Sequence, residues 1–365
     1  CQTLSSFSQR IFFARSQTVH HQGPDRNPVT ATAFARTGDM VAGHHLAVTP
    51  DTPSTTNRRP IIDGETLYRG RFAPSPTGPL HFGSIVAAVG SYADARAHNG
   101  QWHLRIDDID ETRTVAGAES AILQTLNVLG FEWSGLPTRQ SHKKSRYLDI
   151  VNTLLDQNYA FPCGCSRRDV QRRAQPQNTT TIYPGTCREG LPLGRTRRTI
   201  RLRVPDTTSV MMDRFLGLFE QNLAREVGDF VVHRADGFTA YQLAVVVDDE
   251  DEGITHVVRG ADLLSSTPRQ QLLQTYLGFT TPTYAHLPVV IDSAGHKLSK
   301  QNAAHPISDT HPLLVLINAW RFLGQVAPSQ VGNVDEFWEA ATCLWSPERI
   351  PQLKSYPMPR LDAGV

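Results

Sequence analysis

Two short stretches of this 365-residue chain predict its fold: RFAPSPTGPLHFGS at residues 71–84 and HKLSK at residues 296–300. Residues 67–73 have the pattern of a short strand, residues 74–79 hold the Pro and Gly of a turn, and residues 80–96 are rich in Ala and Val. His81 and Gly83 are therefore expected at the N-terminus of a helix that follows a strand. Each stretch alone is common, so its weight comes from this context.

Both stretches suit the binding of a nucleotide. A helix N-terminus attracts phosphate, the imidazole of His81 adds a donor, and Gly83 has no Cβ to block a base or ribose. Lys297 and Lys300 flank Ser299 in a polar segment, where two cations would stabilise a departing pyrophosphate. We therefore predict an ATP site with His81, Lys297 and Lys300 as catalytic residues and Gly83 and Ser299 as further ATP contacts.

The order of these segments resembles class I aminoacyl-tRNA synthetases, in particular the glutamyl branch. Further matching segments are RIDDIDETR at 105–113, AYQLAVVVDD at 240–249 and VRGADLLSSTPRQ at 258–270. The resemblance spans about residues 67–305 and implies a ligase that uses ATP, with Mg²⁺, and a tRNA.

Composition agrees with a globular enzyme. The chain is 39% hydrophobic and 19% charged, and it has no apolar run of the roughly 18 to 20 residues that a membrane helix needs. Three of the five Cys are clustered, which favours a metal site in a reducing compartment over a disulfide framework. We expect a cytoplasmic monomer without a membrane partner.

Positive charge is concentrated in one stretch. Residues 161–205 hold ten Arg, no Lys and only two acids, Asp169 and Glu189, so their net charge is +8. A solvated Arg-rich surface is the simpler interpretation of such a run. In a chain that resembles a synthetase, we favour a surface that contacts RNA phosphates.

The same stretch contains Cys163, Cys165 and Cys187, and three thiolates predict a tetrahedral zinc site that lacks one ligand. The spacing alone leaves the fourth ligand open, since no His lies between residues 163 and 187. The YPGTC segment at 183–187 resembles the glutamyl-queuosine tRNA(Asp) synthetases, which implies Tyr183 as that ligand. Three free cysteines in a loop is the alternative.

The C-terminal part supports this short branch. Only 65 residues follow Lys300, with helices expected over 312–323 and 334–344 and a Pro-rich end. The resemblance implies a synthetase core without the helical anticodon-binding region. Such an enzyme activates L-glutamate with ATP without tRNA, and it esterifies glutamate to queuosine in the anticodon loop of tRNA(Asp).

The resemblance also implies a glutamate pocket, in which Arg would bind a carboxylate and an acid the ammonium group. Its residues would be Arg71, Phe72, Ala73, Pro74, Ser75, Asp107, Tyr241 and Arg259, with Arg259 for the side-chain carboxylate. Asp107 stands where the family has Glu. Asp248 to Glu252 are expected to form a solvated acidic loop.

The predicted fold is α/β: a Rossmann-like core in two halves, with the ligand at the carboxyl ends of strands where the strand order reverses. The expected parts are a disordered extension (1–66), a first half (67–160), a basic zinc-binding insertion (161–225), a second half (226–305) and a short helical C-terminal appendage (306–365).

Three functions remain open. They are the glutamyl-queuosine enzyme, a truncated glutamyl-tRNA synthetase that charges a tRNA 3′ end, and a catalytically silent RNA-binding paralogue. The absent anticodon region disfavours the second function, and intact His81, Gly83, Lys297 and Lys300 disfavour the third.

Overall fold

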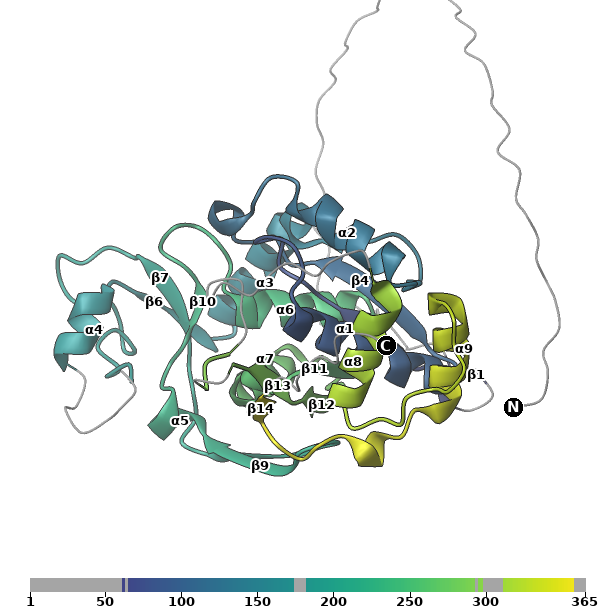
Figure 1. The fold of residues 1–365 in the computed structure, drawn as a ribbon. Coiled ribbons are helices and arrows are strands. Elements are labelled where there is room, and N and C mark those ends of the chain that lie inside the picture. Colours follow the sequence, from purple (N-terminus) through teal and green to yellow (C-terminus); the bar gives the residue numbers. More distant parts are fainter. Residues whose placement is uncertain (1–60, 63–64, 174–181, 293–294, 298–310, 358–365) are drawn as a thin grey trace, which may run out of the picture. The chain divides into compact units, whose positions relative to one another are not determined.

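A computed structural model describes residues 61–62, 65–173, 182–292, 295–297 and 311–357 (Figure 1). Ser299, Lys300 and most of the predicted N-terminal extension lie outside the described residues. The described part begins with a short antiparallel pair, β1 (Ile61–Ile62) and β2 (Glu65–Thr66).

A parallel sheet forms the first part of the α/β core. Its strands are β3 (Arg69–Phe72), β4 (Gln101–Ile106) and β5 (Thr138–Arg139), with β4 in the middle. The helical elements of this part are α1 (Phe82–Ala97), a 3-10 turn (Glu111–Arg113), α2 (Ala118–Val128), a second 3-10 turn (Gln140–Lys143) and α3 (Lys144–Asp156). The strand predicted within residues 67–73 and the helix predicted over 80–96 are both present.

A second parallel pair of strands lies beside β3, at the edge of the first sheet. β11 (His256–Gly260) pairs with β12 (Thr283–Leu287), and a 3-10 turn (Ala261–Ser266) and α7 (Thr267–Leu277) connect them. Thr255 joins this pair to β3: its N–H donates to the Arg69 carbonyl at 2.9 Å, and its Oγ1 accepts from the Arg69 N–H at 2.8 Å. The chain leaves β3 toward β4 and returns to β11 on the other side, so the strand order reverses between β3 and β11.

Helix α1 packs across this reversal point. A Cβ at Gly90 would lie 2.5 Å from Leu287 Cδ1, so the glycine allows α1 to approach β12 closely. α6 (Tyr241–Asp251) precedes β11, and its residues Leu243 to Val247 are buried. They pack in a hydrophobic cluster with Ile150 and Leu154 of α3.

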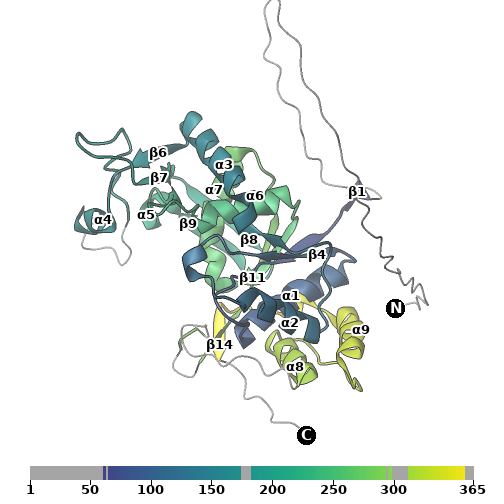
Figure 2. The same cartoon turned by 90° about the horizontal axis from the view of Figure 1, so that it is seen from above.

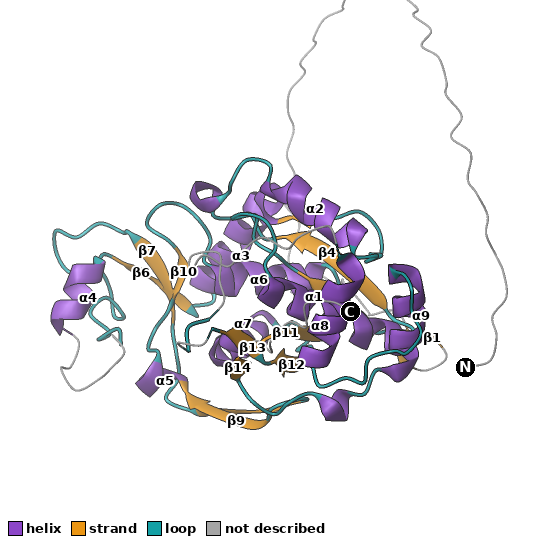
Figure 3. Cartoon of the chain, viewed as in Figure 1, coloured by secondary structure: helices purple, strands orange, loops and turns teal. Residues whose placement is uncertain are grey.

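An antiparallel sheet carries the cysteine-rich stretch (Figure 3). β7 (Thr199–Leu202) lies between β6 (Ala160–Cys163) and β10 (Val231–His233), and α4 (Arg167–Arg173) follows β6. The hairpin β8 (Thr208–Asp213) and β9 (Gly217–Asn222) instead packs on the core, where Met211 is buried with Ile254 and Tyr284. α5 (Leu223–Glu226) follows it. The predicted insertion over 161–225 is therefore divided between two packing environments.

The predicted short helical C-terminal region is present, and its helices pack on the main core. α8 (Pro312–Phe322) and α9 (Val334–Leu344) pack on α1 (Figure 2). Trp320 and Phe337 are fully buried with the residues of α1 and β4, and the indole of Trp338 donates to the Leu129 carbonyl at 2.8 Å. After a 3-10 turn (Pro347–Arg349), β14 (Ser355–Pro357) pairs in parallel with β13 (Val289–Ile291).

Candidate active site

A cavity of about 440 Å³ lies at the carboxyl ends of β3, β11 and β12. Predicted site residues that line it are Phe72, Ala73, Pro74, Ser75, His81, Gly83 and Lys297. Gly260, the last residue of β11, and Asp262 also line it. Residues from the two distant signatures therefore meet in one cavity of a size that suits a small-molecule ligand.

His81 is the N-cap of α1. Its backbone is extended (φ −112°, ψ 169°), and its Nδ1 accepts from the Ser84 N–H at 3.3 Å. A neutral imidazole that accepts at Nδ1 carries its proton on Nε2. The cap thus gives the ring a donor at Nε2 while the helix N-terminus adds a positive potential beside it.

Lys297 extends from a turn after β13. It forms a backbone bridge with Ile291, and its Nζ lies 2.6 Å from Asp262 Oδ2. About half of the Lys297 side chain is exposed at the cavity. An ammonium paired with one exposed carboxylate can exchange that partner for a phosphate oxygen at little cost.

Arg71 lies deeper, at the end of β3, and is only 4% exposed. Its Nε and Nη2 contact the two carboxylate oxygens of Asp249 on α6, at 3.2 and 3.4 Å. A surface salt bridge is thereby excluded for Arg71, since both partners are buried.

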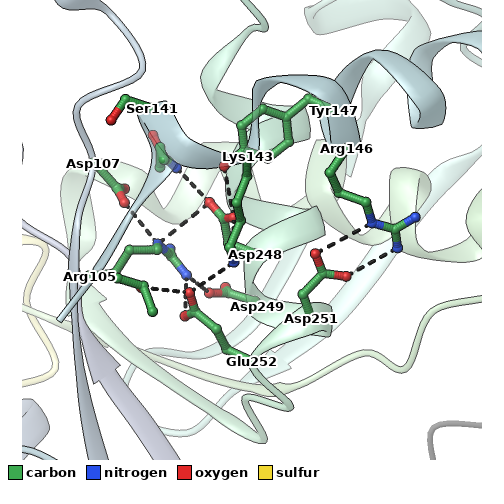
Figure 4. A network of polar contacts seen from close by, with 12 residues as sticks. Arg105, Asp107, Ser141, Lys143, Arg146, Tyr147, Asp248, Asp249, Asp251 and Glu252 are labelled. Carbon is green, nitrogen blue, oxygen red and sulfur yellow. Dashed lines mark hydrogen bonds and ion pairs between the residues drawn. The ribbon is translucent and has the colours of Figure 1, made fainter. Parts of the chain in front are cut away.

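Arg105 of β4 is the centre of a buried ion cluster (Figure 4). Its Nε donates to Asp107 at 2.8 Å, and its Nη1 donates to Asp249 at 2.9 Å and to Glu252 at 3.0 Å. The guanidinium is fully buried, as is Asp248 at 3.6 Å. We call the seven residues Arg71, Arg105, Asp107, Lys143, Asp248, Asp249 and Glu252 the ion cluster.

The expected solvated acidic loop over Asp248 to Glu252 is wrong in this structure. Asp248 and Asp249 lie in α6 and are 0% and 5% exposed. Asp248 accepts from the hydroxyl of Tyr147 and the amide of Gln140, both at 2.8 Å, and pairs with Lys143 at 3.1 Å. These carboxylates are therefore paired with cations of β3, β4 and the 3-10 turn (Gln140–Lys143), and not solvated as the sequence pattern predicted.

The ion cluster contains four carboxylates and three cations. Among the three cations of the cluster, only Arg105 contacts Asp107, whose side chain is 7% exposed. Burial raises the pKa of the Asp107 carboxyl to about 7, although Arg105 acts in the opposite direction. A ligand ammonium beside Asp107 would supply the missing positive charge.

Arg259 of β11 is held by a second buried network. Its Nε donates to His286 Nε2 at 3.1 Å, and its Nη2 donates to Thr267 at 2.9 Å and Gln270 at 2.8 Å. His286 Nδ1 lies 2.5 Å from Asp213, so the ring is protonated there and accepts at Nε2. Burial lowers the pKa of His286, which keeps this acceptor available.

Tyr241 begins α6 and is half-buried. Arg71, Asp107, Tyr241 and Arg259 do not line the 440 Å³ cavity in the described part of the chain. The cavity is therefore lined by predicted nucleotide residues and by the predicted glutamate residues at 72–75, whereas the other four predicted glutamate residues lie outside its lining.

Cys163, at the end of β6, converges with Cys165 and Cys187. Their Sγ atoms lie within 4.8 Å of one another, and Cys165 and Cys187 are 3.7 Å apart. A tetrahedral zinc site with Zn–S bonds of about 2.3 Å requires sulfurs roughly 3.8 Å apart. The Tyr183 oxygen lies 3.4 Å from Cys163 Sγ, beside the same group.

The electrostatics of this cluster favour one thiolate. Burial raises the pKa of Cys163, but the Tyr183 hydroxyl, the Cys165 N–H and the Arg201 guanidinium together lower it to about 7. Burial raises the pKa of Cys165 to about 11. The donors present, thiols and a phenol in a buried pocket, fit a zinc ion.

An open cleft of about 1090 Å³ lies next to the cysteines. Arg113, Arg167, Arg198, Arg201 and Arg234 line it, together with Asp110, Asp229 and Asp236. Arg234 pairs with Asp110 and Asp236, whereas Arg167 and Arg198 are exposed and have no acidic partner among the described residues. The cleft is therefore cationic where α4 and β7 border it.

Sequence reasoning gave no role to Arg105, Lys143, Asp249 or His286. Arg105 lies in the RIDDIDETR segment, and Asp249 lies in the AYQLAVVVDD segment. The signal that the sequence offered for both was a charged residue beside the apolar positions of an expected strand or helix. Lys143 and His286 carried no local signal, because their partners are more than 70 residues away.

Comparisons with known proteins agree with this geometry. Residues 68–312 match the catalytic domain of class I tRNA synthetases (E and Q). Fold and site together define a class I aminoacyl-tRNA synthetase core. The chain is 51% identical over 294 residues to the glutamyl-Q tRNA(Asp) synthetase of Aromatoleum aromaticum, which covers 80% of this chain and 93% of the relative. It is 52% identical over 286 residues to that of Janthinobacterium sp., covering 76% and 97%. The chain belongs to the glutamyl-Q tRNA(Asp) synthetase family.

Solved structures share the fold. Glutamate-tRNA synthetase from Elizabethkingia anophelis superposes with a TM-score of 0.67 at 23% identity, over 80% of this chain and 68% of that chain. The glutamate tRNA ligase of Elizabethkingia meningosepticum, in complex with its amino acid, gives 0.66 at 24% identity, over 80% and 67%. No helix among the described residues has the length and apolar character to cross a membrane.

Proposed function

We propose that this enzyme activates L-glutamate with ATP, without tRNA, and transfers the glutamyl group to queuosine in the anticodon loop of tRNA(Asp). The observation that carries the proposal is the identity of 48 to 52% to glutamyl-Q tRNA(Asp) synthetases over 93 to 97% of their length. The cavity between β3 and β11 supplies a compatible site.

In the first step, a carboxylate oxygen of glutamate attacks the α-phosphorus of ATP, and pyrophosphate leaves. His81 Nε2–H and the N-terminus of α1 are placed to bind phosphate oxygens, and Lys297 borders the same cavity. These donors stabilise charge that develops on the phosphates. Mg²⁺ supplies further neutralisation of the triphosphate when bound.

We assign glutamate to the part of the site formed by Arg71, Asp107 and Arg259. Asp107 would receive the ammonium group, since the ion cluster lacks one positive charge there. Arg71 and Arg259 would bind carboxylates. In the second step, a hydroxyl of the queuosine cyclopentenediol attacks the glutamyl carbonyl, and AMP leaves.

We further propose that Cys163, Cys165, Cys187 and Tyr183 bind one structural Zn²⁺ that orders the antiparallel sheet. The adjoining cleft with Arg167 and Arg198 would then contact the phosphates of the tRNA. The proposal is supported by the short distances between the sulfurs and by the cationic border of the cleft.

Glutamate-dependent ATP–pyrophosphate exchange tests the first step. We expect exchange without tRNA. Labelled glutamate should then appear in the anticodon loop of queuosine-containing tRNA(Asp), and not on tRNA(Asp) with unmodified guanosine. Exchange that requires tRNA, with label on the 3′ end, would instead identify a truncated glutamyl-tRNA synthetase.

A further inference from the structure

We propose that Asp249 is a positioning residue for glutamate: its carboxylate fixes the guanidinium of Arg71, and Arg105 ties this pair to Asp107. The inference rests on the proposed glutamate site and adds a residue to which no binding role has been assigned.

The contact between Asp249 and Arg71 is side-on. Asp249 Oδ1 faces Nε at 3.2 Å, and Oδ2 faces Nη2 at 3.4 Å. Two parallel contacts fix the plane of a guanidinium as well as its position. Among the described residues, no hydrogen bond involves Arg71 Nη1, so this nitrogen remains available to a ligand carboxylate.

Arg105 links the pair of Asp249 and Arg71 to Asp107. It is fully buried, and it contacts Asp107 through Nε and Asp249 through Nη1. A displacement of Asp249 would therefore affect both Arg71 and Asp107. These two residues are the ones proposed for opposite charges of the same amino acid.

The cluster also spans the two halves of the core. Arg71 and Arg105 come from β3 and β4, whereas Asp248 and Asp249 come from α6 and Glu252 directly follows it. Charges in a buried environment interact strongly and reorganise little. The position of α6 thereby sets the geometry of residues on the neighbouring strands.

A purely structural ion pair is the competing explanation. It would hold α6 in place, and its loss would lower stability and affect both substrates alike. Positioning of Arg71 predicts a selective effect on glutamate. The Michaelis constants of the two substrates distinguish these explanations.

The test compares Asp249→Asn with Asp251→Asn in ATP–pyrophosphate exchange. Asp251 lies on the same helix, but it pairs with Arg146 at the surface, at 3.1 Å. We expect Asp249→Asn to raise the KM for glutamate about tenfold to hundredfold, as loss of a charged hydrogen bond does, with the KM for ATP unchanged. Asp251→Asn should match the parent in both.

A double-mutant cycle with Arg71→Lys identifies the route of the effect. If Asp249 acts through Arg71, the effect of Asp249→Asn on the glutamate KM should be much smaller in the Arg71→Lys background. Equal effects in both backgrounds would show that Asp249 does not act through Arg71.

Asp249→Glu covers the case in which the asparagine variant fails to fold. It keeps the charge but moves the carboxylate by one methylene, so it should fold and still raise the glutamate KM. A parent-like glutamate KM in folded Asp249→Asn or Asp249→Glu would overturn the inference. If the parent itself lacks glutamate-dependent exchange, the proposed function fails instead.

Discussion

Asp107→Asn should make the protein more stable at neutral pH while abolishing glutamate activation. The folded-state pKa of Asp107 is raised from 3.8 to about 7, chiefly by burial. For a raised pKa, the stabilising contribution is fully present below the unfolded value and is lost as pH rises through the folded value. Asparagine keeps an oxygen that can accept from Arg105 Nε but never ionises.

The magnitude follows from the shift. About three pKa units, at about 1.4 kcal/mol each, set a ceiling of about 4 kcal/mol for the cost of ionising Asp107 in the fold. Between pH 5 and pH 8, the stability of the parent relative to the variant should fall by about 2 to 3 kcal/mol, since part of the cost already arises below pH 5.

Urea unfolding at constant ionic strength measures this difference at each pH. Asp251→Asn is the matched control, and its stability should run parallel to that of the parent. Saturating glutamate should stabilise the parent at pH 8 but not Asp107→Asn, because the ligand ammonium needs the carboxylate. If the difference in unfolding free energy between the parent and Asp107→Asn does not change from pH 5 to pH 8, the raised pKa of Asp107 is refuted.

Three further outcomes are expected. Lys300→Ala, which lies outside the described residues, should slow adenylate formation about 100-fold in pre-steady-state assays with little change in glutamate binding, because the ammonium acts on charge that develops as pyrophosphate leaves. Cys187→Ser should release zinc, as metal analysis of fresh protein would detect, and weaken tRNA(Asp) binding in a salt-dependent way while exchange persists. Asp94→Asn should lower the free energy of unfolding by about 3 kcal/mol in urea titrations, because buried Asp94 pairs with Arg214 at 2.6 Å and also accepts from Tyr68 and Trp345.

The sequence correctly predicted helices and helix ends whose signals lie close to them in the chain. The helix at residues 312–323 and the one at 334–344 correspond to Pro312–Phe322 and Val334–Leu344. His81 was expected at a helix N-terminus, and it is the N-cap of α1. In each case, turn residues and apolar spacing lie within a few residues of the feature that they specify.

Long-range burial could not be predicted in this way. The acidic residues from Asp248 to Glu252 have the composition of a solvated segment, but their partners, Arg71, Arg105 and Lys143, are more than 100 residues away in the chain. The C-terminal helices were correctly placed in the sequence, yet their packing on the core depends on long-range contacts such as those of Trp338 with Tyr92 and Phe131 of the first half. The roles of individual site residues stay predictions.

The parallel pairing of β13 and β14 places the last described strand beside residues that line the cavity, since Val289 and Val290 of β13 belong to its lining. The Val289 N–H donates to the Lys354 carbonyl at 2.9 Å, and Tyr356 stacks on Phe322 with ring centroids 4.1 Å apart. β13 leads within a few residues to Lys297. A reporter or purification tag fused after residue 357 would therefore be attached to the strand that pairs with β13, so slow adenylate formation in such a fusion should be compared with that of the untagged enzyme.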